Sequence, residues 1–126
     1  MATMVCFRAS GAAYCVPVES TRSVRRATGM VALPDARMDV AGIIAGEPPL
    51  TVISPLGTGG GHILVMDAGG KSFGLLVDAV TGLVRVAAAD IGAIPEGQSR
   101  PLVAGTIDSG GQLVMIADPV AMAGRL

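Results

Sequence analysis

The sequence predicts an all-β protein in which two similar halves form two small β-barrels that lean on each other. Apolar residues alternate with other residues along several short segments, and this period of two is typical of β-strands. The 18 glycines and 8 prolines among 126 residues indicate many turns and argue against a helical bundle. The apolar pattern of residues 4–27 also returns in residues 63–87, where Phe73 matches Tyr14.

The two repeats, about 4–56 and 63–120, are expected to be two barrel subdomains of a single domain that spans residues 1–126. Pro95 occupies the place of Pro34, and Gly105 the place of Gly42, so the spacing drifts only slightly between the copies. Each copy has about five short strands, too few to bury an apolar face alone. Two barrels packed together bury these faces, and barrel closure removes exposed sheet edges.

In the first copy, alternation over residues 5–18 predicts a β-hairpin whose turn lies at Ser10-Gly11. The second strand of this hairpin is expected to continue through Thr21 and Val24. Further strands are predicted at 40–44 and 50–53, and the prolines that flank the latter confine it to an edge or to a short segment.

The second copy repeats this plan with strands at 63–66, 73–77 and 83–86 and with a turn at Gly69-Gly70. Residues 103–105 mirror 40–42, residues 113–120 mirror 50–56, and the tail after 119 is expected to form one short helical turn. The glycine-rich stretch 57–62 predicts a linker or a long hairpin loop. It is not a phosphate-binding loop, because no Lys-Ser/Thr follows it.

No catalytic constellation emerges from the sequence. His62 is the single histidine, so a conventional zinc site lacks ligands, and we expect it to be an exposed loop residue. Glu19 and Asp78 occupy matched positions of the two copies; such a pair could serve acid–base chemistry, but solvated strand ends are the favoured interpretation. Cys6 and Cys15 lie on the two arms of the hairpin and favour two reduced thiols, with a disulfide or a metal pair left open.

The charge balance excludes an electrostatic preference for nucleic acid. The formal net charge is −1, and the one basic cluster, Arg22, Arg25 and Arg26, lacks the aromatic neighbours of a base-stacking platform. Two interpretations of this cluster stay open, a solvent-exposed charged face of a strand or a contact surface for another protein. No apolar run is long enough for a membrane span, and no signal peptide is evident. Charged residues are only 15% and mean hydropathy is +0.62, so exposed apolar area is expected to bind proteins.

Several motifs resemble the CheW-like domain family over about residues 4–122. They are "F-x-x-x-x-x-x-Y-x-V-P-V-x-x-x-x-x-V" from Phe7 to Val24, "LP…V-x-G-I" from Leu33 to Ile43, "GLLVDAV" at 74–80, and the closing "LVMIAD" at 113–118. The resemblance implies two pseudo-symmetric SH3-like five-stranded β-barrels. It also implies a cytoplasmic, non-enzymatic adaptor without a cofactor, which joins the cytoplasmic tips of chemoreceptors to the histidine kinase CheA and is recruited to membrane-bound receptor arrays.

In this family one barrel pairs with the regulatory domain of the kinase, and the groove between the barrels receives the helical hairpin of the receptor. The resemblance implies two sets of residues in this chain. The receptor groove would use Val18, Thr21, Ser23 and Gly42, and the side that faces the kinase would use Met30, Val80 and Leu83. Plain packing within the barrels is the alternative role for these residues.

The middle of the chain departs from the family pattern. The family usually has "G-V-x-N-L-R-G-x-x-x-P-V-x-D-L", whereas residues 42–56 read "GIIAGEPPLTVISPL", and Ser23 replaces a common acidic residue. The missing arginine normally supports receptor and kinase contacts. One alternative is therefore a module that binds the kinase or another array protein without standard receptor coupling. Another is a small-molecule-binding β-barrel with a cleft near Glu19 and His62.

Overall fold

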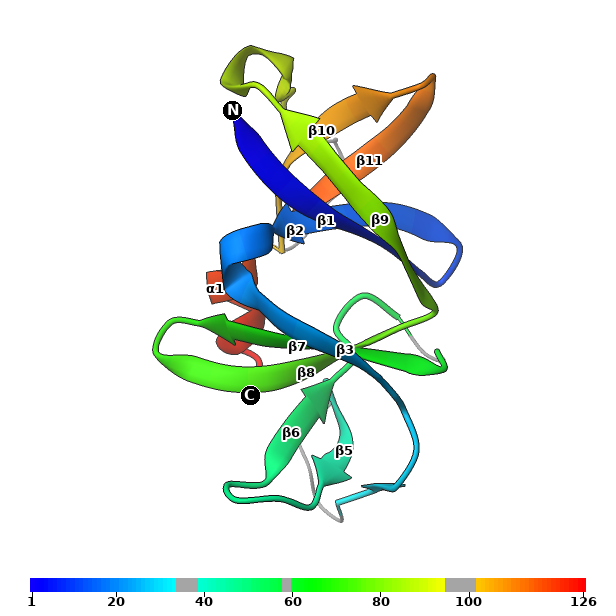
Figure 1. Cartoon of the computed structure of the whole chain (residues 1–126), viewed down its shortest axis with the longest axis vertical. Coiled ribbons are helices and arrows are strands. Elements are labelled where there is room, and N and C mark those ends of the chain that lie inside the picture. Colours follow the sequence, from blue (N-terminus) through cyan, green and yellow to red (C-terminus); the bar gives the residue numbers. More distant parts are fainter. Residues whose placement is uncertain (34–38, 58–59, 95–101) are drawn as a thin grey trace.

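Eleven β-strands, two 3₁₀ helices and one α-helix make up the part of the chain that the computed structural model describes, residues 1–33, 39–57, 60–94 and 102–126 (Figure 1). The expected all-β fold is confirmed. In chain order the elements are β1 (Ala2–Ala9), β2 (Ala12–Pro17), η1 (Val18–Ser20), β3 (Thr21–Arg26), β4 (Met30–Val31), β5 (Val40–Ile44), β6 (Leu50–Ile53), β7 (His62–Ala68), β8 (Lys71–Val77), β9 (Ala79–Val86), η2 (Ala88–Asp90), β10 (Val103–Ser109), β11 (Gln112–Ala117) and α1 (Pro119–Ala123).

The strands form two sheets, which lie one above the other in Figure 1. The upper one, sheet A, has five strands in the order β10-β11-β2-β1-β9. The lower one, sheet B, has six strands in the order β3-β7-β8-β6-β5-β4. The sixth strand of sheet B, β4, is only two residues long, so each sheet has close to the five strands expected for one unit.

The two repeats exchange their hairpins. Sheet A combines β1 and β2 of the first repeat with β9, β10 and β11 of the second, whereas sheet B combines β7 and β8 of the second repeat with β3 to β6 of the first. The sheets therefore do not coincide with the repeats, contrary to the expectation that each repeat builds its own barrel. The crossing segments are β3, which enters sheet B, and β9, which enters sheet A (Figure 1).

Irregularities recur at matched positions of the two repeats. The register of β5 shifts between Val40 and Gly42, and that of β10 shifts between Val103 and Gly105. The bridge between Val31 and Ile43 has its counterpart in the bridge between Gly92 and Thr106. Bulges are designed features that re-aim a strand, so their recurrence shows that the copies share three-dimensional detail as well as sequence.

Most of the predicted strands are confirmed, with two corrections. The hairpin strand β2 does not continue through Thr21; it ends at Pro17, η1 intervenes, and β3 pairs with β7 in the other sheet. The strand β6 is the second of its two expected alternatives, a short segment of four residues, and it lies inside the sheet because it pairs with both β5 and β8. His62 is not a loop residue, because it begins β7. The matched Pro34 and Pro95 lie outside the described residues.

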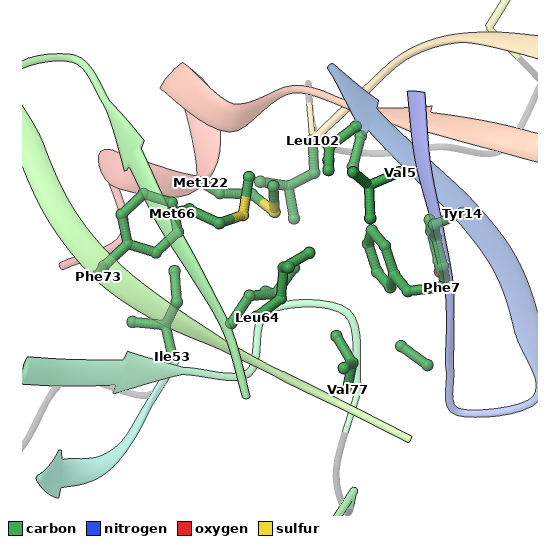
Figure 2. Packing of buried hydrophobic residues seen from close by; sticks show 14 of the residues in the cluster. Val5, Phe7, Tyr14, Ile53, Leu64, Met66, Phe73, Val77, Leu102 and Met122 are labelled. Atoms are coloured by element: carbon green, nitrogen blue, oxygen red, sulfur yellow. The ribbon is translucent and has the colours of Figure 1, made fainter. Parts of the chain in front are cut away.

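The core has three parts. One cluster joins both sheets and contains Phe7, Phe73 and Met122 (Figure 2). The two smaller clusters belong to single sheets; Met4 and Cys15 lie in that of sheet A. Along β1, neighbouring side chains alternate between the shared cluster and the cluster of sheet A, as the two-residue period of a strand requires. Both faces of the strand are therefore buried, and the two sheets are joined by a common apolar layer.

The expected helical turn near the C-terminus is present as α1. Asp118 caps it, since its carboxylate accepts hydrogen bonds from the backbone amides of Val120 (3.0 Å) and Ala121 (3.3 Å). Pro119 at its first turn lacks an amide hydrogen that would have no partner there. The helix directs Met122, which is fully buried, into the cluster that both sheets share.

Candidate functional site

An apolar groove of about 280 Å³ lies between β3 of sheet B and β9 of sheet A. These are the two strands by which the repeats cross from one sheet to the other. Each is an edge strand, because β3 pairs only with β7 and β9 only with β1 among the described residues. The groove is lined by Val5, Thr21, Arg22, Ser23, Val24, Leu64, Val80, Gly82 and Leu83.

The lining of the groove is itself duplicated. Thr21 and Val80 differ by 59 positions, and the same spacing relates Val24 to Leu83. It also relates Ser23 to Gly82, and it relates the buried floor residues Val5 and Leu64. Eight of the nine lining residues thus fall into four matched pairs, and an approximate two-fold axis passes through the groove.

Two large apolar side chains stand exposed at the groove. Leu83 is 68% exposed and its counterpart Val24 is 47% exposed. Scattered exposed apolar residues are normal, but two that line one apolar groove on a protein with few charges form a surface suited to a protein partner. The buried floor and the exposed rim give this groove the anatomy of a docking site rather than of a catalytic pocket.

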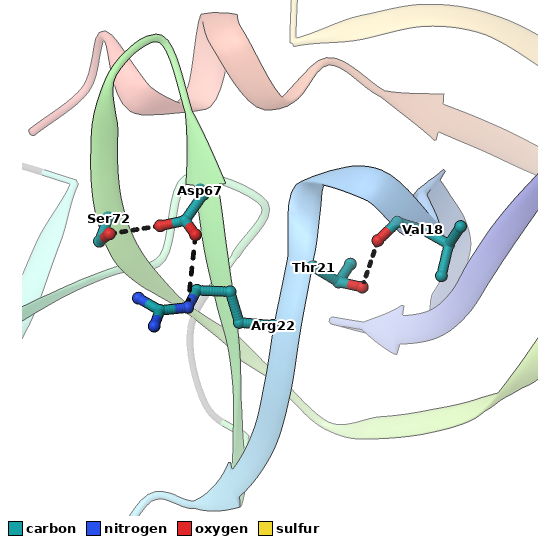
Figure 3. Close-up of polar contacts among 5 residues, drawn as sticks. All are labelled: Val18, Thr21, Arg22, Asp67 and Ser72. Atoms are coloured by element: carbon teal, nitrogen blue, oxygen red, sulfur yellow. Dashed lines mark hydrogen bonds and ion pairs between the residues drawn. The ribbon is translucent and has the colours of Figure 1, made fainter.

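Arginine is the single charged residue type on the two walls. The strands β3 and β9 carry Arg22, Arg25, Arg26 and Arg85 and no Asp or Glu. Arg22 is held from its Nε by the carboxylate of Asp67 at 3.3 Å, and Ser72 donates a hydrogen bond to the same carboxylate (Figure 3). Both partners of this ion pair are about half exposed, so it contributes little to stability and mainly orients Arg22.

The structure redistributes the residues of the two predicted sets. Thr21 and Ser23, expected in the receptor groove, line the same groove as Val80 and Leu83, which were expected on the kinase side. Val18 lies beside them in η1, where its side chain packs against the shared core and its carbonyl accepts a hydrogen bond from Thr21 Oγ1 at 2.8 Å (Figure 3).

Gly42 and Met30 lie together at a different place, on β5 and β4 of sheet B. A Cβ atom added to Gly42 would come within 2.7 Å of Met30 Cγ and of the Val31 carbonyl oxygen, so the two strands approach each other closely here. Beside them Val31 is 62% exposed. We call this the distal end of sheet B. Sheet A has a counterpart, in which Gly105 approaches Ile91 in the same way.

The remaining polar candidates do not assemble into a reactive site. Glu19 and Asp78 are exposed, and Asp78 engages through its backbone: its amide donates to the Arg8 carbonyl (2.8 Å) and its carbonyl accepts from His62 Nδ1 (3.1 Å). Within the described residues no hydrogen bond joins His62 to Glu19, and no three His, Cys, Asp or Glu side chains gather as metal ligands.

Cys6 and Cys15 are directly opposite each other in the β1–β2 hairpin, and both are free thiols. Burial raises the pKa of Cys6, and burial together with the neighbouring Cys6 raises the pKa of Cys15 to about 12. The thiolate is the nucleophilic form, so these raised pKa values leave both residues unreactive near neutral pH.

Within the described parts of the chain, no helix is both long enough and apolar enough to cross a membrane.

Comparison with known proteins places this geometry in context. The model of a family described as the CheW-like domain matches residues 46–126. A crystal structure of the scaffolding protein TtCheW from Thermoanaerobacter tengcongensis is similar, with a TM-score of 0.82 and 19% sequence identity, over 93% of this chain and 88% of that chain. At this level of sequence identity, the structural similarity shows that the two proteins share a fold and shows nothing more. No curated protein sequence matches the chain.

Proposed function

Since this chain belongs to the CheW-like domain family, we propose that it is a non-catalytic adaptor that couples chemoreceptors to a CheA-like histidine kinase in chemotaxis-type signalling. The observation that carries the proposal is the apolar groove on the approximate two-fold axis between the sheets. An adaptor needs surfaces rather than reactive groups, and the described residues offer exposed apolar side chains and unreactive thiols. In this function the protein acts in the cytoplasm, beside membrane-bound receptor arrays.

The groove between β3 and β9 is the proposed docking site for the helical hairpin at the cytoplasmic tip of the receptor. Its support is the pair Val24 and Leu83, whose side chains are exposed on opposite walls above the floor made by Val5 and Leu64. Thr21 and Ser23 are proposed to accompany them, with Val80 and Leu83 moved from the kinase side to this site.

The distal end of sheet B is the proposed docking site for the regulatory domain of the kinase. Val31 is exposed there beside Met30, and neither lines the groove. Gly42 is given a structural role in this assignment, because it lets Met30 and Val31 pack closely over β5.

Paired substitutions test these two assignments. We expect Leu83→Asp to weaken binding of a receptor-tip fragment about tenfold or more and to leave binding of the kinase regulatory domain unchanged, since it charges an apolar contact of one site only. Val31→Asp should do the reverse. Titration calorimetry with each partner measures the effects, and circular dichroism of each variant checks folding. Leu83 is preferred to Val80 because Val80 also packs against the core.

Binding measurements on the wild-type protein also distinguish the adaptor from the alternative functions. Failure to bind either partner would end the adaptor proposal. Binding to the kinase domain alone would favour the module that lacks receptor coupling, which is a second candidate because residues 42–56 lack the usual Asn-Leu-Arg-Gly of the family. Equal binding of Leu83→Asp and wild type to the receptor fragment would show that the groove is not the receptor site.

A further inference from the structure

The two arginines at the far ends of the groove walls are related by the same repeat as the groove itself. Arg26 and Arg85 differ by 59 positions, the spacing that also relates Val24 to Leu83. On each strand the arginine comes two residues after the apolar residue, at 26 after 24 and at 85 after 83. Because side chains two apart on a strand share a face, each wall presents an apolar side chain and then an arginine on one side.

Both arginines are available to a partner. Arg26 and Arg85 are exposed, and neither forms a salt bridge with another described residue, unlike Arg22. No acidic residue lies on either strand, and Asp90 and Asp108, which line a hollow together with Arg85, form no ion pair with it among the described residues. The two strands run in opposite directions, β3 downward and β9 upward in Figure 1, and each arginine lies at or near the C-terminal end of its strand, beyond the apolar residue.

We propose that the groove selects a helical hairpin whose apolar ridge is flanked at both ends by carboxylates, and that Arg26 and Arg85 determine this specificity. The inference rests on the proposed function and names the chemistry that the receptor tip needs. Two antiparallel helices have a local two-fold axis, so a carboxylate from each helix meets one arginine when that axis coincides with the axis of the groove.

Dimensions support the match. Two residues along a strand span about 7 Å. Four residues along an α-helix span about 6 Å. A helix that places an apolar side chain against Val24 or Leu83 therefore brings the carboxylate of a residue one turn away to the neighbouring arginine. An arginine can hold such a carboxylate through two parallel hydrogen bonds, which adds geometric selectivity to the charge attraction.

Charge reversal at the two positions tests the inference. We expect Arg26→Glu and Arg85→Glu each to weaken binding of the receptor-tip hairpin about fivefold, and the double variant more than tenfold, in titration calorimetry at low salt. Added salt should weaken wild-type binding and should weaken the Arg26→Gln/Arg85→Gln variant much less. The Gln variant also removes charge without creating repulsion, so it keeps the test valid if a reversed variant folds poorly.

Arg25→Glu is the matched control, because Arg25 lies on the same strand with its side chain on the opposite face to Val24. Lys71→Glu makes the same charge change on β8, away from the groove lining. Both should bind the hairpin within twofold of wild type. Restored binding of the double reversal to a hairpin whose flanking acids are changed to lysine would support direct pairing.

The outcomes separate this inference from the proposed function. If Leu83→Asp loses binding while the double reversal binds like wild type, the groove is the receptor site but the arginines do not select its ligand, and the inference is overturned alone. If Arg25→Glu weakens binding as much as Arg26→Glu, the overall positive charge of the surface determines the affinity rather than these two positions, and the inference is again overturned. If wild type does not bind the hairpin, both proposals fail together.

Discussion

At the scale of single residues, the cysteine pair illustrates how register decides chemistry. The turn at Ser10-Gly11 has two residues with positive φ, and its closing pair is Ala9 and Ala12. In a hairpin with a two-residue loop the closing pair is hydrogen-bonded, and pairs alternate from there, so Cys6 and Cys15 form a non-hydrogen-bonded pair in close approach. Cys15 is fully buried, and its neutral thiol behaves as a small apolar side chain.

The raised pKa of Cys15 predicts a loss of stability at high pH. The folded protein keeps the thiol neutral up to about pH 12, while the unfolded chain releases its proton near pH 9. Above pH 9 the unfolded state therefore binds fewer protons, and the free energy of unfolding falls as pH rises from 9 toward 12. We expect the fall between pH 8 and 10.5 to be smaller in Cys15→Ala than in wild type by about 2 kcal/mol.

Urea denaturation under reducing conditions at the two pH values measures this difference, and Cys6→Ala is the matched control with a smaller expected change. Equal pH dependence of wild type and Cys15→Ala would show that Cys15 does not titrate as described. The free-thiol state was predictable, because two cysteines on the arms of a hairpin in a protein without other metal ligands favour it. The depth of burial of Cys15 was not, because it depends on strands β10 and β11 that come a hundred residues later.

At the scale of elements, the recurring shift at Gly42 and Gly105 shows why each distal strand contains a glycine. The Cβ atom of any other residue at 42 would meet Met30 Cγ and a backbone oxygen, both at 2.7 Å. A side-chain atom of methionine can move, but the backbone oxygen of Val31 cannot move without disturbing the pairing of β4 with β5. The repeated Val-Ala-Gly sequence predicted that the two strands correspond. The contact between Gly42 and Met30 could not be predicted from the sequence, because it depends on the path of the chain between β4 and β5.

Gly42→Ala is therefore expected to lower the free energy of unfolding by about 1–3 kcal/mol, as is usual for overpacking. Gly61→Ala is the control, because nothing lies within 4 Å of its Cβ position and its backbone φ is ordinary for any residue. Chemical denaturation of both variants measures the difference. Wild-type stability of Gly42→Ala with weakened receptor binding would instead assign Gly42 to the receptor groove, as the family resemblance implies.

At the scale of the whole molecule, the exchange of hairpins makes each half depend on the other. The hairpin β1–β2 obtains its neighbours β9 and β11 from the second repeat, and β7–β8 obtains β3 and β6 from the first. We expect fragments 1–57 and 60–126 to remain unfolded when produced separately, because each carries unpaired strands and an open apolar face. Mixed together, they should regain strand structure.

Circular dichroism and amide proton spectra of each fragment and of the equimolar mixture measure this. Cooperative unfolding of either fragment alone would contradict the exchanged topology and restore one barrel per repeat. Fragment 1–57 alone, at the same total protein concentration as the mixture, provides the reference for nonspecific association.

The duplication and the two-sheet fold were predictable from the sequence, whereas the exchange was not. The repeats share one apolar pattern, so β1 can pair with β9 of the second repeat as well as with a strand of its own repeat. The alternation of apolar residues alone cannot distinguish these two pairings. The site was predictable in part for the same reason. Thr21, Ser23, Val80 and Leu83 were predicted as candidates in two separate sets, but their position in one groove depends on β3 and β9 lying side by side.

The exchanged topology has a consequence for how such a protein arises and changes. Two identical subunits that trade hairpins make an intertwined homodimer, and joining one subunit to the next yields a single gene product with this architecture. Before such a fusion, any new side chain appears on both sides of the central cleft at once. After it, the two sides diverge: Arg22 of one repeat corresponds to Thr81 of the other, and Ser23 corresponds to Gly82. Fusion thus releases the molecule from obligatory symmetry and lets it recognise a ligand whose own halves differ.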